Sequence, residues 1–155
     1  MSEQLAADDC FTCAQTARGT DAPQRERVAT TGHWRVAHAF NTSLPGWLVI
    51  VPRQHVLAFD ELSIQACVEL GPLVHDLTSA LRECLGCTKT YLMQFSEAEG
   101  YSHLHLHLVP RMPDMPEEAK GPRCFTYLEV EESLRVPVAQ VDLLAAALIE
   151  SLASG

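Results

Sequence analysis

The sequence predicts an α+β domain in which helices flank an antiparallel sheet of about five strands. Four segments have strand character, and they follow one another in two closely spaced pairs, residues 33–40 with 47–52 and residues 88–95 with 102–109. Between the pairs, apolar residues recur at intervals of three and four from Phe59 to Leu81, which is typical of an amphipathic helix. Strands that are neighbours in sequence, with helices outside their runs, favour an antiparallel sheet.

Length and composition favour a single domain over residues 1–155. A chain of 155 residues, of which 47% are hydrophobic, can bury a core of its own. We expect a polar, irregular leader over residues 1–32, a core over residues 33–111, and a last part over residues 112–155. That last part is predicted to hold a proline-rich loop, one more strand in "FTYLEVE" and a C-terminal helix in "VAQVDLLAAALIESLA".

Charge and hydropathy exclude several classes of protein. The chain has 11 lysines and arginines against 20 acidic residues, a formal net charge of -9, so no nucleic-acid interface is expected. The N-terminus lacks a basic start followed by an apolar run, and no long apolar stretch occurs, so neither secretion nor membrane insertion is expected. We therefore expect a cytoplasmic protein whose six cysteines serve in metal binding or burial rather than in disulfides.

Turn residues and prolines set the boundaries of these elements. The segment "NTSLPG" separates the first two strands, which predicts a hairpin. Pro52 ends the second strand of that hairpin. Pro72 interrupts the helical pattern, so we expect either a kinked helix or two shorter helices.

The segment "SHLHLHLV" carries the strongest functional signal in the sequence. Side chains alternate between the two faces of a strand, so His103, His105 and His107 share one face while the leucines between them point to the core. A solvent-facing strand would mix polar residue types, whereas this face uses only imidazoles, which titrate near neutrality, bind metals and act as nucleophiles. Two chemistries fit this pattern: a catalytic zinc held by the histidines, or a nucleophilic imidazole assisted by its neighbour.

The motif resembles the signature of the histidine triad superfamily, in which three histidines alternate with apolar residues. Residues 103–109 fill that pattern without a mismatch, and "LPGWLVIVPRQHV" resembles the segment that precedes it in the family. The resemblance covers about residues 33–111 and implies the family's fold. The chain departs from the pattern in two places, because Trp47 stands where the family has a histidine and the loop "EAEGYSH" is two residues shorter.

The resemblance implies a nucleotide hydrolase or nucleotidyl transferase that works through a covalent nucleotidyl-histidine intermediate. In the family the middle histidine attacks the α-phosphorus of a nucleoside phosphate, and that role falls here on His105. His107 is expected to bond the phosphate or the bridging oxygen. We expect phosphate contacts from four further residues: His38, Gln94, Ser102 and Arg111.

A pair of cysteines in the leader predicts a metal site. In "CFTC", the two-residue separation lets Cys10 and Cys13 reach the same zinc ion. The resemblance is closest to the zinc-containing bacterial branch of the superfamily, with members described as dinucleoside-polyphosphate hydrolase-like, and it implies His55 and His103 as the other two ligands. Such a site is closed, so its Zn²⁺ would be structural and would pin the leader to the core. The second cysteine pair, in "ECLGC", is expected to be buried.

Two other functions stay open from the sequence. In one, the triad histidines themselves hold a catalytic zinc, and in the other the domain binds nucleotides without catalysis. The ligand expected in each nucleotide-dependent case is a nucleotide or dinucleotide. The resemblance also implies a homodimer, because family members pair their sheets edge to edge and thereby cover an exposed strand.

Overall fold

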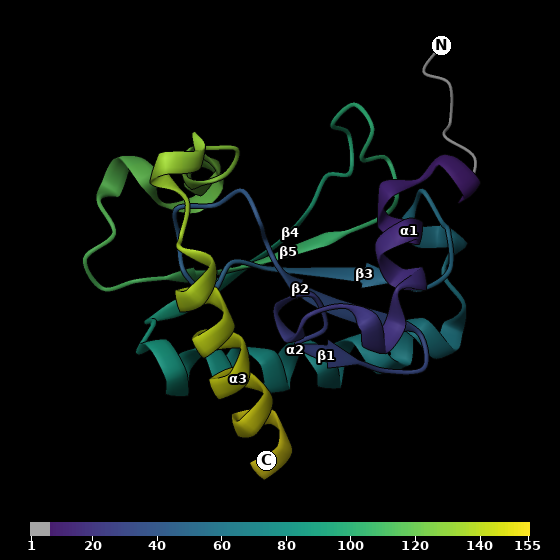
Figure 1. Cartoon of the computed structure of the whole chain (residues 1–155), viewed down its shortest axis with the longest axis horizontal. Coiled ribbons are helices and arrows are strands. Elements are labelled where there is room, and N and C mark those ends of the chain that lie inside the picture. The colour runs from purple at the N-terminus through teal and green to yellow at the C-terminus, as the bar shows by residue number, and fades with distance from the viewer. Residues whose placement is uncertain (1–6) are drawn as a thin grey trace.

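The computed structural model describes residues 7–155, which form a five-stranded antiparallel sheet with helices packed around it (Figure 1). The strands lie in the order β1-β2-β3-β5-β4, and they are β1 (Ala29–Thr30), β2 (Trp34–His38), β3 (Leu48–Pro52), β4 (Lys89–Gln94) and β5 (Leu106–Arg111). The α-helices are α1 (Phe11–Ala17), α2 (Ile64–Leu85) and α3 (Val138–Ser154). Short 3₁₀ helices connect them: η1 (Ala7–Asp9), η2 (Gly19–Asp21), η3 (Gln24–Glu26), η4 (Phe59–Glu61), η5 (Glu117–Ala119), η6 (Gly121–Tyr127) and η7 (Glu132–Leu134). The predicted α+β fold is confirmed.

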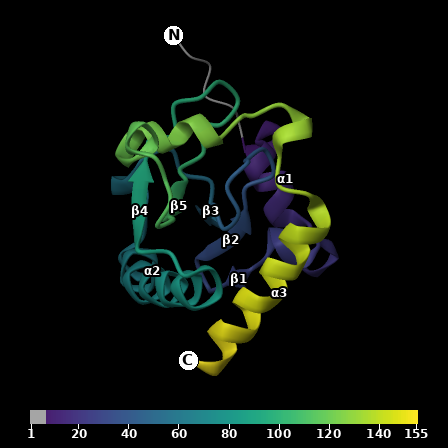
Figure 2. The same cartoon turned by 90° about the vertical axis from the view of Figure 1, so that its left-hand side faces the viewer.

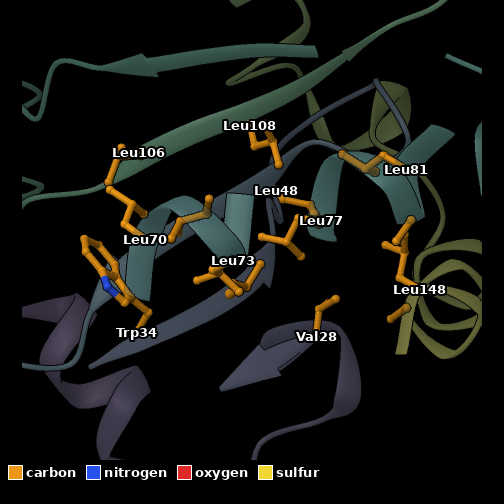
Figure 3. Packing of buried hydrophobic residues seen from close by; sticks show 14 of the residues in the cluster. Val28, Trp34, Leu48, Leu70, Leu73, Leu77, Leu81, Leu106, Leu108 and Leu148 are labelled. Carbon is orange, nitrogen blue, oxygen red and sulfur yellow. The ribbon is translucent and has the colours of Figure 1, made fainter. Parts of the chain in front are cut away.

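The two faces of the sheet have different roles. On one face, alternate residues of the strands pack against α2 and form the main core: Trp34, Val36, Leu48, Ile50, Leu106 and Leu108. Their partners on α2 include Leu70, Leu73, Leu77 and Leu81 (Figure 3). Figure 2 shows α2 beneath the strands and α3 beside it, and Leu148 of α3 joins the same core. On the opposite face, a second apolar cluster that includes Val109, Met115 and Cys124 covers one part, and the functional site occupies another.

The predicted hairpin of β2 and β3 turns at a residue that has to be glycine. Gly46 has a φ of +86°, a backbone conformation that side chains disfavour. A Cβ at this position would lie 2.4 Å from Leu85 Cδ1, at the end of α2. The Gly46 N–H donates to His38 Nε2 over 2.9 Å, which ties the turn to the last residue of β2. The turn thus packs closely against both the helix and the strand.

α2 is one element of 22 residues despite the proline in its interior. The Ser63 hydroxyl caps its N-terminus by accepting a hydrogen bond from the Ala66 N–H over 3.1 Å, and Gly86, with a φ of +69°, ends it. The expectation of two shorter helices is wrong. Pro72 removes one backbone hydrogen bond, but leucines on both sides of it pack against the same sheet face and hold the helix together.

Two predicted segments differ in the structure. The leader is not irregular, because it contains α1, short 3₁₀ helices and β1, which pairs antiparallel with β2; residues 1–6 of the predicted leader lie outside the described residues. The strand expected in "FTYLEVE" is absent from the sheet of residues 7–155. That segment instead forms the end of η6 and one isolated bridge between Thr42 and Leu128. Among the described residues, no helix combines the length and the apolar character needed to cross a membrane.

Candidate active site and metal centre

Of the three triad histidines, only His107 lies within β5, and His103 and His105 lie in the segment just before it. Before the strand, the backbone bonds to other parts of the chain. The Leu104 N–H donates to the Val56 carbonyl over 2.8 Å, and the His105 N–H donates to Ser96 Oγ over 3.0 Å. The predicted strand from residue 102 therefore begins four residues later, because a loop contact and a side chain replace the sheet ladder there.

The contacts of His105 define which of its ring nitrogens is free. A carbonyl oxygen can only accept, so the 2.8 Å contact between Nδ1 and the His103 carbonyl places the ring proton on Nδ1. Nε2 then carries a lone pair. No residue in the described part of the chain bonds to this nitrogen, and the ring lines the cavity described below. The arrangement is that of an available nitrogen nucleophile.

The contacts of His107 define the opposite arrangement. The Trp47 indole N–H donates to His107 Nδ1 over 3.1 Å, and both side chains are buried. Burial, followed by the charge of neighbouring His105, lowers the pKa of His107 to about 4. The ring is therefore neutral at pH 7. Because Nδ1 accepts from Trp47, the ring proton of this neutral form is on Nε2.

A cavity of about 830 Å³ covers the sheet face that carries His105 and His107. Side chains of β2, β3 and the triad segment form its floor, while α1, residues 95–98 and residues 125–129 contribute to its walls. Phe11 on α1 contacts Phe40 and Tyr101, with ring centroids 6.2 Å and 5.7 Å apart. This size and mostly apolar lining suit a nucleotide-sized ligand.

Three of the residues predicted to bind phosphate, Gln94, Ser102 and Arg111, are not among the described residues that line the cavity. Arg111 is four residues beyond His107, which is about 13 Å along a strand. There its Nε and Nη2 groups donate to Thr88 Oγ1 over 3.2 Å and 3.1 Å. Arg111 therefore lies at the end of β5 away from the cavity, and its contact with phosphate stays a prediction.

His38, the fourth predicted phosphate ligand, lies at the cavity but has no free nitrogen. Its Nδ1–H donates to the Ala39 carbonyl over 2.7 Å, and its Nε2 accepts from the Gly46 N–H over 2.9 Å. Burial lowers the pKa of His38, which favours the neutral ring that these two bonds require. Both ring nitrogens of His38 thus bond backbone groups at the hairpin turn, and its contact with phosphate stays a prediction.

Sequence reasoning missed two residues that the fold brings to the site. Arg35 on β2 is buried under the cavity, where its Nε donates to Thr16 Oγ1 over 3.1 Å and its Nη1 to the Glu26 carbonyl over 2.9 Å. Its signal was a single charge inside the apolar strand "HWRVAHAF". Ser96, with a φ of +57°, holds the backbone of His105 through its hydroxyl and had no signal in the sequence.

The four predicted metal ligands Cys10, Cys13, His55 and His103 come together although they are far apart in the sequence. Their ligand atoms all lie within 4.8 Å of one another. Cys10 precedes α1, Cys13 lies in its first turn, and the two histidines follow β3 and precede β5. No other group of three or more possible metal ligands occurs in residues 7–155, so His105 and His107 do not share in one.

The distances within this cluster suit a tetrahedral ion. The Sγ to Nδ1 distances are 3.4 Å from Cys10 to His103, 3.3 Å from Cys13 to His55, and 3.5 Å from Cys13 to His103. Zinc bonds of about 2.3 Å to sulfur and about 2.0 Å to nitrogen, at a tetrahedral angle, place the two atoms about 3.5 Å apart. Two thiols and two imidazoles are also the donor set that zinc prefers.

The protonation of the cluster also fits a metal centre. The His103 Nε2–H donates to the Pro52 carbonyl over 3.0 Å, which leaves the Nδ1 lone pair directed at the thiols. Burial lowers the pKa of His103, so its ring is neutral, as a ligand must be. Burial and the adjacent Cys10 raise the pKa of the Cys13 thiol to about 11, so metal binding there would release protons.

The other four cysteines lie outside this cluster, and all six are free thiols. Cys87 and Cys124 are buried, and Cys67 and Cys84 are half-buried. Of the second cysteine pair, Cys87 is buried in the main core as expected, whereas Cys84 is half-buried and packs against that core.

No family model and no curated protein matches this sequence. Its structure is nevertheless similar to solved structures. A Hit-like protein involved in cell-cycle regulation from Bartonella henselae has a TM-score of 0.71 at 15% identity, covering 96% of this chain and 99% of that one. A Zn-bound histidine triad family protein from Mycobacterium smegmatis has a TM-score of 0.67 at 18% identity, covering 97% and 100%.

A third similar structure is a diadenosine triphosphate hydrolase from Plasmodium falciparum, solved in complex with cyclomarin A. It has a TM-score of 0.64 at 14% identity, and the match covers 86% of this chain and 80% of that one. Identities this low establish the fold rather than the activity. The protein has the histidine triad fold, with a Cys₂His₂ cluster at its N-terminal side.

Proposed function

We propose that the protein is a nucleotide hydrolase or nucleotidyl transferase that cleaves a bond at the α-phosphate through a nucleotidyl-His105 intermediate. The observation that carries this proposal is the free Nε2 of His105, whose partner nitrogen is held by the His103 carbonyl. The similar hydrolase from Plasmodium falciparum, which acts on diadenosine triphosphate, supports the same class of chemistry. A dinucleoside polyphosphate is therefore one substrate to test.

In the first step, His105 Nε2 attacks the α-phosphorus and a P–N bond forms. The bond between phosphorus and the leaving group breaks, and the leaving group departs with the electron pair. Water or another acceptor then attacks the same phosphorus, the P–N bond breaks, and the acceptor's proton passes to solvent. His107 Nε2–H would donate to a phosphate or bridging oxygen, and the Arg35 guanidinium would place positive charge near the phosphates.

The second part of the proposal is that Cys10, Cys13, His55 and His103 hold a structural Zn²⁺. A closed site with four protein ligands leaves no open position for substrate. The ion would fix the start of α1, and α1 carries Phe11 and Thr12 into the cavity wall. The ligands present thus fit a role in shaping the cavity rather than in the chemical step.

The experiment that tests the catalytic proposal traps the intermediate. The protein is quenched during turnover of adenylated and guanylated phosphoanhydrides and phosphoramidates, and peptides are analysed by mass spectrometry for a nucleotidyl group on His105. His105→Ala should abolish both adduct and turnover. His75→Ala, at an exposed histidine outside the cavity, is the matched control. Full activity in His105→Ala, or nucleotide binding without turnover in the wild type, would contradict the proposal.

Metal analysis tests the zinc proposal separately. The wild-type protein should contain about one zinc per chain, and Cys10→Ser should lose most of it, because a closed site needs all four ligands. Cys67→Ser, at a half-buried cysteine outside the cluster, should keep the metal. Retention of zinc in Cys10→Ser would contradict the assignment.

We also propose that the protein is a homodimer that pairs through β4. This strand is at the edge of the sheet, and Leu92 on it and Phe95 after it are about half exposed. Sedimentation velocity on the wild type and on a Leu92→Lys variant tests the proposal. The wild type should sediment as a dimer and the variant as a monomer, and a monomeric wild type would refute it.

A further inference from the structure

We infer that Trp47 is a positioning residue that holds His107 as a neutral hydrogen-bond donor, with its proton on Nε2. This inference rests on the proposed function, because it assigns the role of His107 in that reaction. A neutral His107 ring can donate a hydrogen bond from Nε2–H, but it cannot act as an acid that transfers a proton to the leaving group. This limits the class of substrate. The site is then suited to leaving groups that depart as stable anions, as in phosphoanhydrides.

The hydrogen bond between Trp47 and His107 can run in one direction only. The indole N–H of Trp47 can donate a hydrogen bond but cannot accept one. It lies 3.1 Å from His107 Nδ1, so that nitrogen must be the acceptor. Trp47 is fully buried and His107 is 7% exposed, so water does not compete for either group. The neutral ring therefore keeps its proton on Nε2.

Neighbouring rings fix the orientation of the His107 imidazole. Three aromatic rings meet His107 nearly at right angles: His105 at a centroid distance of 5.0 Å, Phe125 at 5.1 Å and Trp47 at 5.7 Å. Phe125 also packs edge-on against Trp47, with centroids 5.3 Å apart. A half-turn of the imidazole inside this enclosure would put Cδ2 in the place of Nδ1, which breaks the Trp47 bond, and Cε1 in the place of Nε2–H, which removes the donor. Packing and hydrogen bonding thus select the same orientation.

In the histidine triad pattern, a histidine stands at the position of Trp47. A histidine there could either donate to or accept from His107, so the proton of His107 could change nitrogen during the reaction. A tryptophan allows only one direction. The neutral state at pH 7 follows from the burial that lowers the pKa of His107 to about 4. His107 can therefore stabilise charge on an oxygen, whereas an amine leaving group would need a proton from elsewhere.

The test combines nuclear magnetic resonance with kinetics. Long-range ¹H–¹⁵N spectra of the protein with ¹⁵N-labelled histidine report which ring nitrogen of His107 is protonated. In the wild type at pH 7, His107 should be neutral with the proton on Nε2. In Trp47→Phe the tautomer should become mixed, and kcat on a dinucleoside polyphosphate should fall about 3- to 10-fold, the effect of one lost hydrogen bond. KM should change by less than about twofold, because the bond acts in the chemical step.

Two further variants separate positioning from a general loss of structure. Trp34→Phe removes an equally buried indole N–H, which donates to the Ala66 carbonyl over 2.8 Å, and it should leave tautomer and kcat at wild-type values. Trp47→His should recover part of the lost kcat and increase phosphoramidate cleavage relative to anhydride cleavage. The inference is overturned if wild-type His107 is protonated on Nδ1, if Trp47→Phe behaves like Trp34→Phe, or if the wild type prefers phosphoramidates. A missing His105 adduct would refute the proposed function while leaving the measured tautomer in place.

Discussion

The buried His107 ring predicts a loss of stability in mild acid. Its pKa is about 4 in the folded chain and 6.5 in an ordinary environment, because burial and then the charge of His105 disfavour the protonated ring. The unfolded chain therefore binds a proton that the folded chain does not. The free energy of unfolding is therefore undiminished by His107 above pH 6.5, and it decreases as the pH falls toward 4, because protonation of His107 favours the unfolded chain.

The magnitude follows from linkage at about 1.4 kcal/mol per pKa unit. The full shift corresponds to about 3 kcal/mol, of which about 2 kcal/mol is lost between pH 7 and pH 5. Urea unfolding at these two pH values measures it in the wild type and in His107→Gln, whose amide oxygen can still accept from Trp47. The variant should lose about 2 kcal/mol less than the wild type over this interval. Groups that do not interact with His107 titrate equally in both proteins, so an identical pH dependence would refute the reasoning.

Three further predictions concern the metal centre, the hairpin turn and the triad loop. Cys10→Ser should raise KM more than it lowers kcat in steady-state kinetics, because the metal anchors the wall that α1 forms; an unchanged KM would contradict this. Gly46→Ala should lower the unfolding free energy by about 1 to 3 kcal/mol in urea, and by more than Gly121→Ala, where a Cβ meets no atom within 4 Å. Ser96→Ala should lower kcat about 3- to 10-fold, because its hydroxyl bonds both backbone groups of His105, and an unaltered kcat would count against that role.

Most of the sheet and the helices were predictable because local periodicity and tertiary packing agree there. The strands β2, β3 and β4 lie within their predicted segments, and the N-cap Ser63 and the C-terminal Gly86 bound α2. β1 was not predictable, since its two residues form a strand only by pairing with β2. Residues 125–131 have strand-like composition, but Phe125, Tyr127 and Leu128 pack against the apolar cluster around Trp47, and the segment makes one bridge, to Thr42, instead of pairing along an edge of the sheet.

Some residues of the site could be predicted from the sequence and others could not. Residues fixed by motif spacing, such as the triad and the two cysteines, were predictable because their chemistry requires that spacing. The phosphate contacts expected from the sequence stay predictions: His38 lines the cavity, whereas Gln94, Ser102 and Arg111 are not among the described residues that line it. Arg111 lies at the far end of β5, whereas Arg35 reaches the cavity from β2 because alternation turns it away from Trp34 and Val36.

The three triad histidines have the same side chain but three chemical states, and one hydrogen bond decides each of them. The Pro52 carbonyl takes the Nε2 proton of His103, so Nδ1 faces the thiols as a ligand. The carbonyl of His103 takes the Nδ1 proton of His105, so Nε2 keeps a lone pair, as the proposed nucleophile must. The Trp47 indole donates to Nδ1 of His107, so Nε2 becomes a donor. Two of these partners are backbone carbonyls, which a substitution does not remove, and only the third is a side chain. Of the three histidines, His107 is therefore the one whose state a single substitution, at Trp47, can change. Under the proposed function, we expect the leaving-group preference to depend on residue 47.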